Sequence, residues 1–348
     1  MINRPDYIEA IEPFIDKPLV KILAGVRRCG KSTIFEMLKE EFLRRGVSAD
    51  HIICKRYTEM DIPENITAKQ MYDELTAAMA SKGHCYLLLD EIQEIDGWEK
   101  AINSLLEGAD ADIYVTGSNS KLMSSEISTY LTGRYVSIPV YTLSFKEYLA
   151  FKQDSSISRR ELLEEYIRFG GFPIVALSEY DEQSAYQIVN GIYHTVVSRD
   201  IVKRHRINKQ DLFDRVVKYI IENMGKTFSA NSISTFLKSE HRKVSVESIY
   251  NYLRWLEQAF IIYPCERYDL QGKSILKTQE KYYLSDVSLK YALLGYNRKM
   301  LDGAMENIVF LELKRRGYDV FIGKNDAKEI DFVATRRDER IYVQVCVQ

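Results

Sequence analysis

The stretch GVRRCGKS at residues 25–32 constrains this chain more than any other feature. Its spacing is that of a phosphate-binding loop, in which backbone N–H groups and a helix N-terminus meet the phosphates of a nucleotide. The context fits, because an apolar run from Leu19 to Ala24 precedes the loop and a helical pattern from Thr33 to Arg45 follows it. A chance match is the alternative, and it is expected about 0.01 times in a chain of this length.

Positions within the loop have different expected roles. Lys31 is expected to reach the β- and γ-phosphates, and the hydroxyl of Ser32 is expected to ligate Mg²⁺. The glycines let the backbone turn its N–H groups inward, toward the anion. The predicted nucleotide-binding residues are Gly25, Val26, Arg27, Arg28, Cys29, Gly30, Lys31, Ser32 and Thr33.

A second motif is an apolar run that ends in two acids, Tyr86 to Glu91. This is the pattern of a buried parallel strand whose carboxyl end presents carboxylates, as in a Walker B motif. Asp90 is predicted to hold the Mg²⁺ shell, and Glu91 to orient and deprotonate the attacking water. Taken alone, such a run is as well explained by a strand that ends in solvent; downstream of a phosphate-binding loop the catalytic interpretation is favoured.

A further core strand is predicted from Ala111 to Asn119. A polar side chain at its end would lie between the Walker acids and the γ-phosphate, and Asn119 and Ser118 are the candidates. The alternative is that they cap the short helix that follows. Strand and helix patterns alternate four times up to this point, which predicts an α/β fold with a parallel sheet and helices on both faces.

Arg134 lies in the segment TGRY, just before a final strand at residues 136–140. This neighbourhood suits an arginine finger, whose guanidinium stabilises γ-phosphate charge in a neighbouring subunit of a homo-oligomer. A surface salt bridge is the alternative for a residue type this abundant.

Composition limits the remaining classes of function. A chain of 348 residues is expected to form two or three domains. Its 48 Lys and Arg and 50 Asp and Glu give a net charge of -2, which does not indicate a nucleic-acid or membrane partner. The five cysteines form no metal-binding or disulfide pattern. Without a secretory segment or a long apolar run, the protein is expected to be cytoplasmic.

The region from 207 to 286 follows the order of a winged helix, after a helical stretch at 151–206. Three helices are expected at 212–224, 229–237 and 245–258, then strands at 260–268 and 280–284, with a turn at 271–273 between them. In a DNA-binding module the third helix enters the major groove. Its outward residues are predicted to be Glu247, Ser248, Asn251, Tyr252 and Arg254, preceded by His241, Arg242 and Lys243. This face is only mildly basic, so double-stranded DNA and a protein both stay open as partners.

The last region, residues 287–348, is similar to the PD-(D/E)xK nuclease fold. In that fold a helix Glu, a strand Asp and a following (Glu or Gln)-x-Lys converge on a metal, and Glu306, Asp331 and Gln344 match the first three positions. Cys346 stands where the lysine belongs, which favours a degenerate nuclease fold kept for binding or scaffolding. Because the sequence ends on a strand-like run, further elements are expected beyond Gln348.

Together these motifs resemble the prokaryotic AAA+ ATPases of the archaeal-type ATPase group. The resemblance covers essentially the whole chain and rests on GVRRCGKS, LLLDEIQ, TGSNSKL, TGRY and, later, FGGFP at residues 169–173. It implies a P-loop NTPase domain at residues 1–150, ATP and Mg²⁺ as ligands, and the finger role for Arg134.

The expected function is therefore Mg²⁺-dependent hydrolysis of ATP, which changes how the ATPase domain sits against a C-terminal half that binds a partner. Two alternatives remain. One is a nucleotide-dependent switch that binds ATP, turns it over negligibly and contacts a protein. The other is an ATP-regulated nuclease, against which Cys346 weighs.

Overall fold

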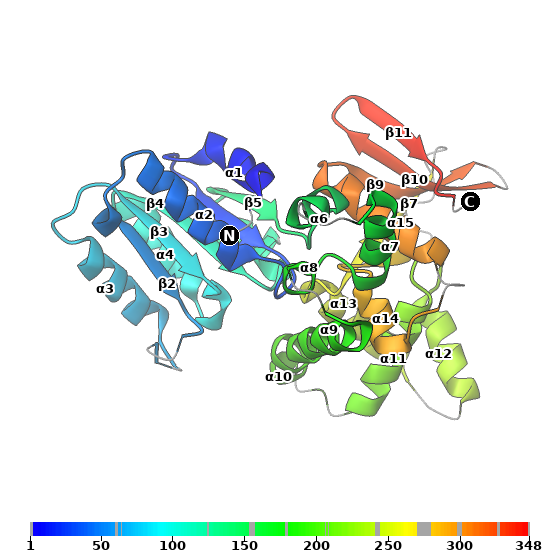
Figure 1. The fold of residues 1–348 in the computed structure, drawn as a ribbon. Coiled ribbons are helices and arrows are strands. Elements are labelled where there is room, and N and C mark those ends of the chain that lie inside the picture. Colours follow the sequence, from blue (N-terminus) through cyan, green and yellow to red (C-terminus); the bar gives the residue numbers. More distant parts are fainter. Residues whose placement is uncertain are drawn as a thin grey trace. The chain divides into compact units, whose positions relative to one another are not determined.

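The chain forms two compact units, Met1–Val140 and Tyr141–Gln348. Figure 1 shows them in a computed structural model, with the first unit in blue to green and the second in green to red. The structure describes residues 3–59, 62, 63, 65–123, 125–152, 157–177, 180–205, 207, 209–240, 244–269, 280–297, 301–325 and 328–346. The predicted turn at 271–273 and the basic residues 241–243 lie outside these ranges.

The first unit is built on a five-stranded sheet in the order β2-β3-β4-β1-β5, in which all neighbouring strands are parallel. The strands are β1 (Val20–Ala24), β2 (Ile52–Arg56), β3 (Cys85–Asp90), β4 (Ala111–Gly117) and β5 (Tyr135–Pro139). Every residue of β1 and β3 is buried, as continuous apolar runs in a covered parallel sheet should be. The predicted α/β fold is confirmed.

Helices follow the strands and cover the sheet (Figure 1). They are α1 (Pro5–Ile11), η1 (Glu12–Phe14), α2 (Lys31–Arg44), η2 (Ala49–His51), α3 (Ala68–Met79), η3 (Ile92–Glu94), α4 (Trp98–Gly108), η4 (Ser120–Met123) and α5 (Ser125–Tyr130). Local chemistry sets some of their ends. Thr67, for example, forms a reciprocal capping box with Gln70 at the start of α3. In such a sheet the carboxyl ends of the strands form one edge, which positions the site described below.

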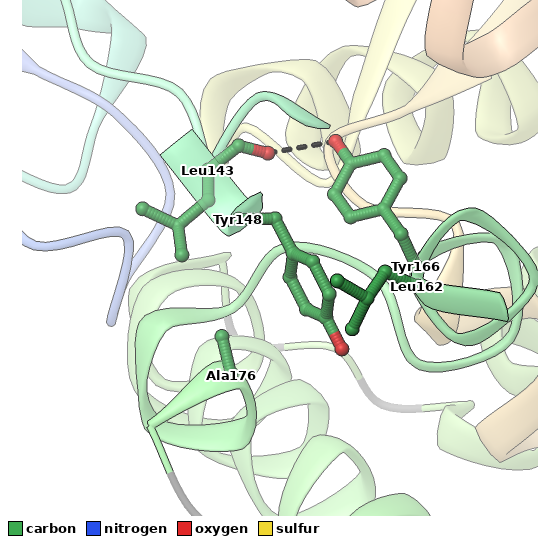
Figure 2. Packing of buried hydrophobic residues seen from close by; sticks show 5 residues of the cluster. All are labelled: Leu143, Tyr148, Leu162, Tyr166 and Ala176. Atoms are coloured by element: carbon green, nitrogen blue, oxygen red, sulfur yellow. Dashed lines mark hydrogen bonds between the residues drawn. The ribbon is translucent and has the colours of Figure 1, made fainter. Parts of the chain in front are cut away.

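The second unit contains mostly helices. They are α6 (Phe145–Phe151), α7 (Arg159–Phe169), α8 (Pro173–Ala176), α9 (Glu182–Val196), the π-helix η5 (Val197–Val202), α10 (Lys203–His205), α11 (Gln210–Glu222), α12 (Ala230–Ser239), α13 (Val246–Gln258), α14 (Ser288–Leu294) and α15 (Leu301–Arg315). Tyrosines from α6 and α7, Tyr148 and Tyr166, pack with Leu143, Leu162 and Ala176 in the cluster of Figure 2.

Two sheets complete this unit. Strands β6 (Ile262–Cys265) and β8 (Lys281–Leu284) pair antiparallel, and a second sheet has the order β11-β10-β9-β7. Its members are β7 (Arg267–Asp269), β9 (Asp319–Asn325), β10 (Lys328–Arg336) and β11 (Glu339–Val343). Helices α11 to α13 followed by the β6–β8 pair have the element order predicted for residues 207–286.

Two local predictions in this unit are wrong. The single strand expected at 260–268 is two strands, because the chain leaves β8 after Cys265 and β7 pairs with β9 instead. Tyr252, expected to face outward, is buried against Phe213 with the ring centroids 5.2 Å apart. The exposed aromatic residue of α13 is Tyr250. Tyr252 follows Ile249 by three residues, so helical spacing puts both on the core face.

Candidate functional site

The predicted phosphate-binding loop joins β1 to α2. Gly25 must be glycine, because a Cβ there would lie 1.9 Å from the backbone oxygen of Val140. Gly30 has a φ of 104° and immediately precedes Lys31, the first residue of α2. The side chain of Cys29 is fully buried, which raises the pKa of its thiol, so only its backbone is available to a phosphate. The buried Arg4 stabilises the loop, because its Nη1 donates to the carbonyl oxygen of Cys29 at 2.8 Å.

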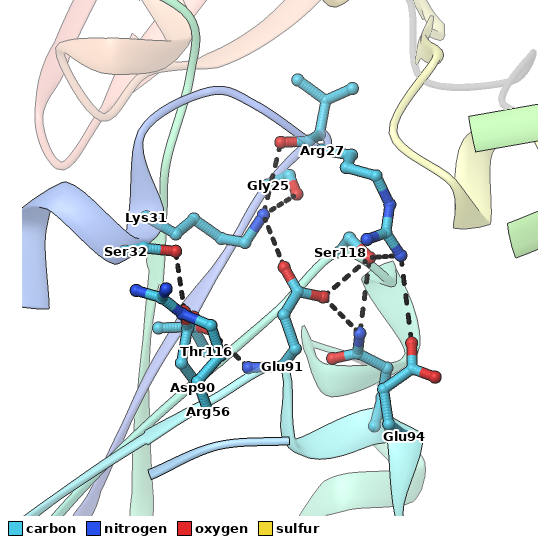
Figure 3. Close-up of polar contacts among 12 residues, drawn as sticks. Gly25, Arg27, Lys31, Ser32, Arg56, Asp90, Glu91, Glu94, Thr116 and Ser118 are labelled. Carbon is cyan, nitrogen blue, oxygen red and sulfur yellow. Dashed lines mark hydrogen bonds and ion pairs between the residues drawn. The ribbon is translucent and has the colours of Figure 1, made fainter. Parts of the chain in front are cut away.

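Lys31 is buried at the centre of the loop (Figure 3). Its Nζ donates to the carbonyl oxygens of Gly25 at 3.0 Å and Val26 at 3.3 Å, and it lies 3.7 Å from Oε1 of Glu91. The ammonium thus contacts both the loop and the second acid of the Walker B motif. A terminal phosphate placed at the loop would be within reach of the same group.

Asp90 lies at the carboxyl end of β3, directly beside Ser32. The Ser32 hydroxyl donates to Oδ2 of Asp90 at 2.7 Å. The same oxygen accepts from Nε of Arg56, at the end of β2, at 2.9 Å, while Oδ1 accepts from the hydroxyl of Thr116. A hydroxyl and a carboxylate in contact are oxygen ligands of the kind that Mg²⁺ prefers, so Ser32 and Asp90 fit the predicted metal.

Glu91 follows Asp90 in a left-handed conformation, with a φ of 55°. Its Oε2 accepts from Nε2 of Gln93 at 2.5 Å and from the hydroxyl of Ser118 at 3.2 Å. Burial alone would raise the pKa of Glu91, but Lys31, Arg27 and the two hydrogen bonds outweigh it and hold this pKa below its ordinary value. Glu91 is therefore a nearly buried carboxylate in its charged form, the form that a general base requires.

Ser118 and Asn119 are the two candidates for a sensor, the polar side chain between the Walker acids and the γ-phosphate. They make different contacts. Ser118 contacts Glu91, and Nη2 of Arg27 in the loop lies 3.4 Å from its hydroxyl. Oδ1 of Asn119 instead accepts from the backbone N–H of Lys121 at 2.8 Å, the capping contact that was its alternative interpretation. Ser118 thus lies within the charged cluster, whereas Asn119 holds the turn that begins η4.

Arg134 lies outside this cluster. It precedes β5, so it lies at the amino ends of the parallel strands, opposite the edge that carries Asp90 and Glu91. Its Nη2 contacts Oε1 of Glu107 at 2.6 Å and Oδ1 of Asn103 at 2.9 Å. Within one chain, Arg134 therefore makes the surface salt bridge that was the alternative to a finger role.

Sequence reasoning missed several residues of the site. Arg56, Thr116 and Gln93 each contact one of the two acids. Arg56 is the last residue of β2, Thr116 is the last but one of β4, and Gln93 follows the end of β3 by three residues. A position near the carboxyl end of a strand is the one signal that could have identified them. Their contacts depend on strand register, since Arg56 lies directly beside Asp90 across the β2–β3 pair.

A second polar cluster lies in the second unit, where the nuclease-like residues were predicted. Oε2 of Glu306, on α15, accepts from the hydroxyl of Tyr283 at 3.1 Å and lies 3.5 Å from Nζ of Lys281. Asp331, on β10, accepts from Nε2 of Gln344 at 2.7 Å. Burial, then the charge of Asp331, raises the pKa of Glu306 although Lys281 opposes the rise.

Lys281 is the unexpected member of this cluster. It comes from β8, is 4% exposed and was not singled out by any motif. Cys346, at the motif's lysine position, is exposed. Among the described residues, no three His, Cys, Asp or Glu side chains gather where they could hold a metal ion. No helix in the same part of the chain is long and apolar enough to cross a membrane.

Comparisons with known proteins agree with the fold and the loop. A family model described as an AAA domain matches residues 17–149, and a model for a domain of unknown function matches residues 160–299. The solved structure of a Walker-type ATPase from Pyrococcus abyssi aligns with a TM-score of 0.59 and 14% identity, over 84% of this chain and 96% of that one. The first unit thus has the fold of an AAA+ P-loop NTPase domain.

Two relatives extend over both units. An uncharacterized protein of Haemophilus influenzae is 37% identical over 100% of this chain and 87% of its own length. An uncharacterized protein of Methanocaldococcus jannaschii is 33% identical over 94% of this chain and 75% of its own. The chain belongs to the same family as these two proteins.

Proposed function

We propose that the first unit binds ATP with Mg²⁺ and hydrolyses it. The observation that carries this proposal is the convergence of Lys31, Ser32, Asp90 and Glu91 at one edge of the sheet, with Lys31 and Glu91 3.7 Å apart and Ser32 and Asp90 in hydrogen-bond contact. Loop, metal ligands and base then occupy one site, as phosphoryl transfer to water requires.

Each residue has a distinct task in this proposal. Lys31 exchanges the carbonyls of Gly25 and Val26 for the phosphates, while Ser32 and Asp90 supply oxygen ligands to Mg²⁺, which would neutralise phosphate charge. Glu91 orients the attacking water and accepts its proton. A pure nucleotide switch has less need of such a base, so Glu91 favours hydrolysis over the switch.

Arg134 and Asn119 have weaker support within one chain. The position of Arg134 at the amino ends of the strands would suit a finger only toward a neighbouring subunit of a homo-oligomer. Asn119 would act as a sensor only by releasing its turn at Lys121. Ser118, which already contacts Glu91, is the better supported of the two sensor candidates.

The second unit is proposed to bind the partner that hydrolysis serves, with duplex DNA as the first candidate. The element order of α11 to α13 and β6 and β8 supports a winged helix. On the third helix, Glu247, Tyr250 and Arg254 are exposed. One acid and one base make this face electrostatically neutral, so a protein partner remains the second candidate.

Steady-state hydrolysis of ATP, with and without duplex DNA, tests the proposal. We expect turnover that requires Mg²⁺ and rises with DNA. Lys31→Ala is expected to weaken ATP binding by about 10- to 100-fold, because it removes charge-assisted hydrogen bonds to the phosphates. If ATP binds but is not hydrolysed with or without DNA, the nucleotide-dependent switch becomes the better explanation. If ATP is hydrolysed at the same rate with and without DNA, a protein becomes the better candidate for the partner.

A second candidate function, cleavage of a phosphodiester, is favoured by one specific observation. Lys281 places an ammonium 3.5 Å from Glu306, so the cluster has a cation despite the cysteine at position 346. Two carboxylates, such as Glu306 and Asp331, are a sufficient protein contribution for Mg²⁺ when substrate oxygens complete its shell. Lys281 would then stabilise developing negative charge.

Lys281→Met should slow the nicking of supercoiled DNA in the presence of Mn²⁺, because it removes this cation from the cluster. We expect about a 100-fold loss, the usual magnitude for removing one electrostatic contact to the transition state. Lys69→Met, at an exposed site on α3 of the first unit, is the matched control. Absence of nicking by the wild type, with the fold intact by circular dichroism, would leave Lys281 and Glu306 as a structural ion pair.

A further inference from the structure

Among the described contacts of Glu91, the hydrogen bond from Gln93 is the shortest. Gln93 does not take part in the proton transfer or metal binding proposed above. Its Nε2 donates to Oε2 of Glu91 at 2.5 Å and to the hydroxyl of Ser118 at 3.4 Å. The orientation of the amide is determined, because a carboxylate only accepts and therefore requires the NH₂ group on its side. Oε1 of Gln93 is buried and accepts no hydrogen bond within the described part of the chain.

The end of β4 leaves space for the amide of Gln93, because its last residue is Gly117. A Cβ on Gly117 would lie 2.2 Å from Oε1 and 3.1 Å from Cδ of Gln93, and 2.9 Å from Cδ1 of Leu122. Gly117 ends β4, and Thr116 and Ser118 on either side of it contact the two acids. The glycine therefore gives Gln93 the room to lie between the end of β4 and Glu91.

The two oxygens of Glu91 consequently have different surroundings. Oε2 is occupied by Gln93 and Ser118, and Oε1 lies on the side of Lys31, the residue that would turn to the phosphates. We propose that Gln93 is a positioning residue, which fixes Oε2 so that Oε1 is the oxygen that activates the attacking water. This inference rests on the proposed hydrolysis of ATP.

The step itself is a balanced hydrolysis. The water oxygen forms a bond to the γ-phosphorus, the bond from that phosphorus to the β–γ bridging oxygen breaks, and the water proton passes to Oε1 of Glu91. ADP and phosphate leave, and Glu91 returns the proton to solvent. Gln93 exchanges no proton; it keeps the carboxylate from rotating away, and a misplacement of about 1 Å at such a site can cost about 100-fold in rate.

Gln93→Leu tests the proposal through a split between rate and binding. We expect kcat to fall by about 10- to 100-fold, with the affinity for a fluorescent ATP analogue unchanged within about two-fold, because the lost contact orients the base and does not touch the nucleotide. Gln183→Leu, at an exposed site on α9 in the second unit, is the matched control and should match the wild type.

A double-mutant cycle separates positioning from folding. Gly117→Ala alone should also lower kcat, because the methyl group displaces Gln93. Combining Gly117→Ala with Gln93→Ala removes the clash with the amide, and the remaining close atom, Cδ1 at the end of the flexible Leu122 side chain, can shift. The double variant should therefore lose little more than Gln93→Ala alone. Thermal unfolding of every variant is measured in parallel, because a structural role alone would lower stability without this pattern in kcat.

The outcomes distinguish a failure of the positioning role of Gln93 from a failure of the proposed hydrolysis. Wild-type turnover that Gln93→Leu leaves unchanged would overturn the positioning role and leave hydrolysis standing. A fall in nucleotide affinity equal to the fall in kcat/KM would equally reject it, since the contact would then serve binding. If the wild type does not turn over ATP, the proposed function fails and the role of Gln93 fails with it.

Discussion

Glu91→Gln is expected to bind ATP as well as the wild type and to hydrolyse it about 10²- to 10⁴-fold more slowly, the usual contribution of a general base. The amide keeps the shape of the side chain but accepts no proton at neutral pH. It also removes the negative charge 3.7 Å from Lys31, which frees the ammonium for the phosphates. Single-turnover hydrolysis and equilibrium binding, measured on the same preparations, separate the two effects.

Glu40→Gln is the control for this substitution, because Glu40 is an exposed acid on α2. It should retain full turnover. Hydrolysis by Glu91→Gln at the wild-type rate would show that Glu91 is not the base. A loss of ATP binding in the same variant would instead indicate that Glu91 holds the loop in shape through Lys31.

The fold of the first unit could be predicted because its signals are local. Continuous apolar runs at 19–24 and 86–91 correspond to β1 and β3, and a glycine-bounded loop joins the first of them to a helix. The order of the strands could not be obtained in this way. Strand β1 lies between β4 and β5, and that neighbourhood is decided by contacts between residues about 90 to 115 positions apart in the chain.

The candidate site likewise contains residues that local motifs predict and residues that only the fold reveals. Lys31, Ser32, Asp90 and Glu91 belong to motifs with fixed spacing, so sequence alone identified the residues that the fold brings together. The partners of those residues come from register: Arg56 meets Asp90 across β2 and β3, and Gln93 reaches Glu91 only because Gly117 leaves room. Lys281, which reaches Glu306 from another element, could not be found from spacing either.

The FGGFP segment, residues 169–173, acquires a physical explanation in the second unit. Both backbone polar groups of Gly171 form hydrogen bonds. Its carbonyl oxygen accepts from the backbone N–H of Leu143 at 2.7 Å, and its N–H donates to Oδ2 of Asp286 at 2.8 Å. Tyr166 donates to the carbonyl of the same Leu143 at 2.7 Å (Figure 2). Leu143 is therefore hydrogen-bonded to Tyr166 of α7 and to Gly171, and Gly171 is hydrogen-bonded to Asp286 in the turn before α14.

Gly170→Ala should destabilise the second unit by about 3–5 kcal/mol, because it strains the backbone and disrupts a buried polar network. Gly170 has a φ of 72° and a ψ of -162°, a region essentially restricted to glycine, and a Cβ would lie 1.7 Å from Oδ1 of Asp286. Asp286 is fully buried and also accepts from the N–H and hydroxyl of Ser288, so displacing it breaks a buried polar network. The unfolding midpoint of this unit should fall by about 6 °C or more.

Gly191→Ala is the matched control with the opposite sign. Gly191 lies within α9, and the space that a methyl group on its Cα would occupy is open, so alanine should stabilise the helix by about 0.5–1 kcal/mol. Nucleotide binding retained by both variants would show that the first unit stays folded. If Gly170→Ala unfolds at the wild-type midpoint, Asp286 shifts at little cost, and the glycine at position 170 is not explained by the close approach of that carboxylate.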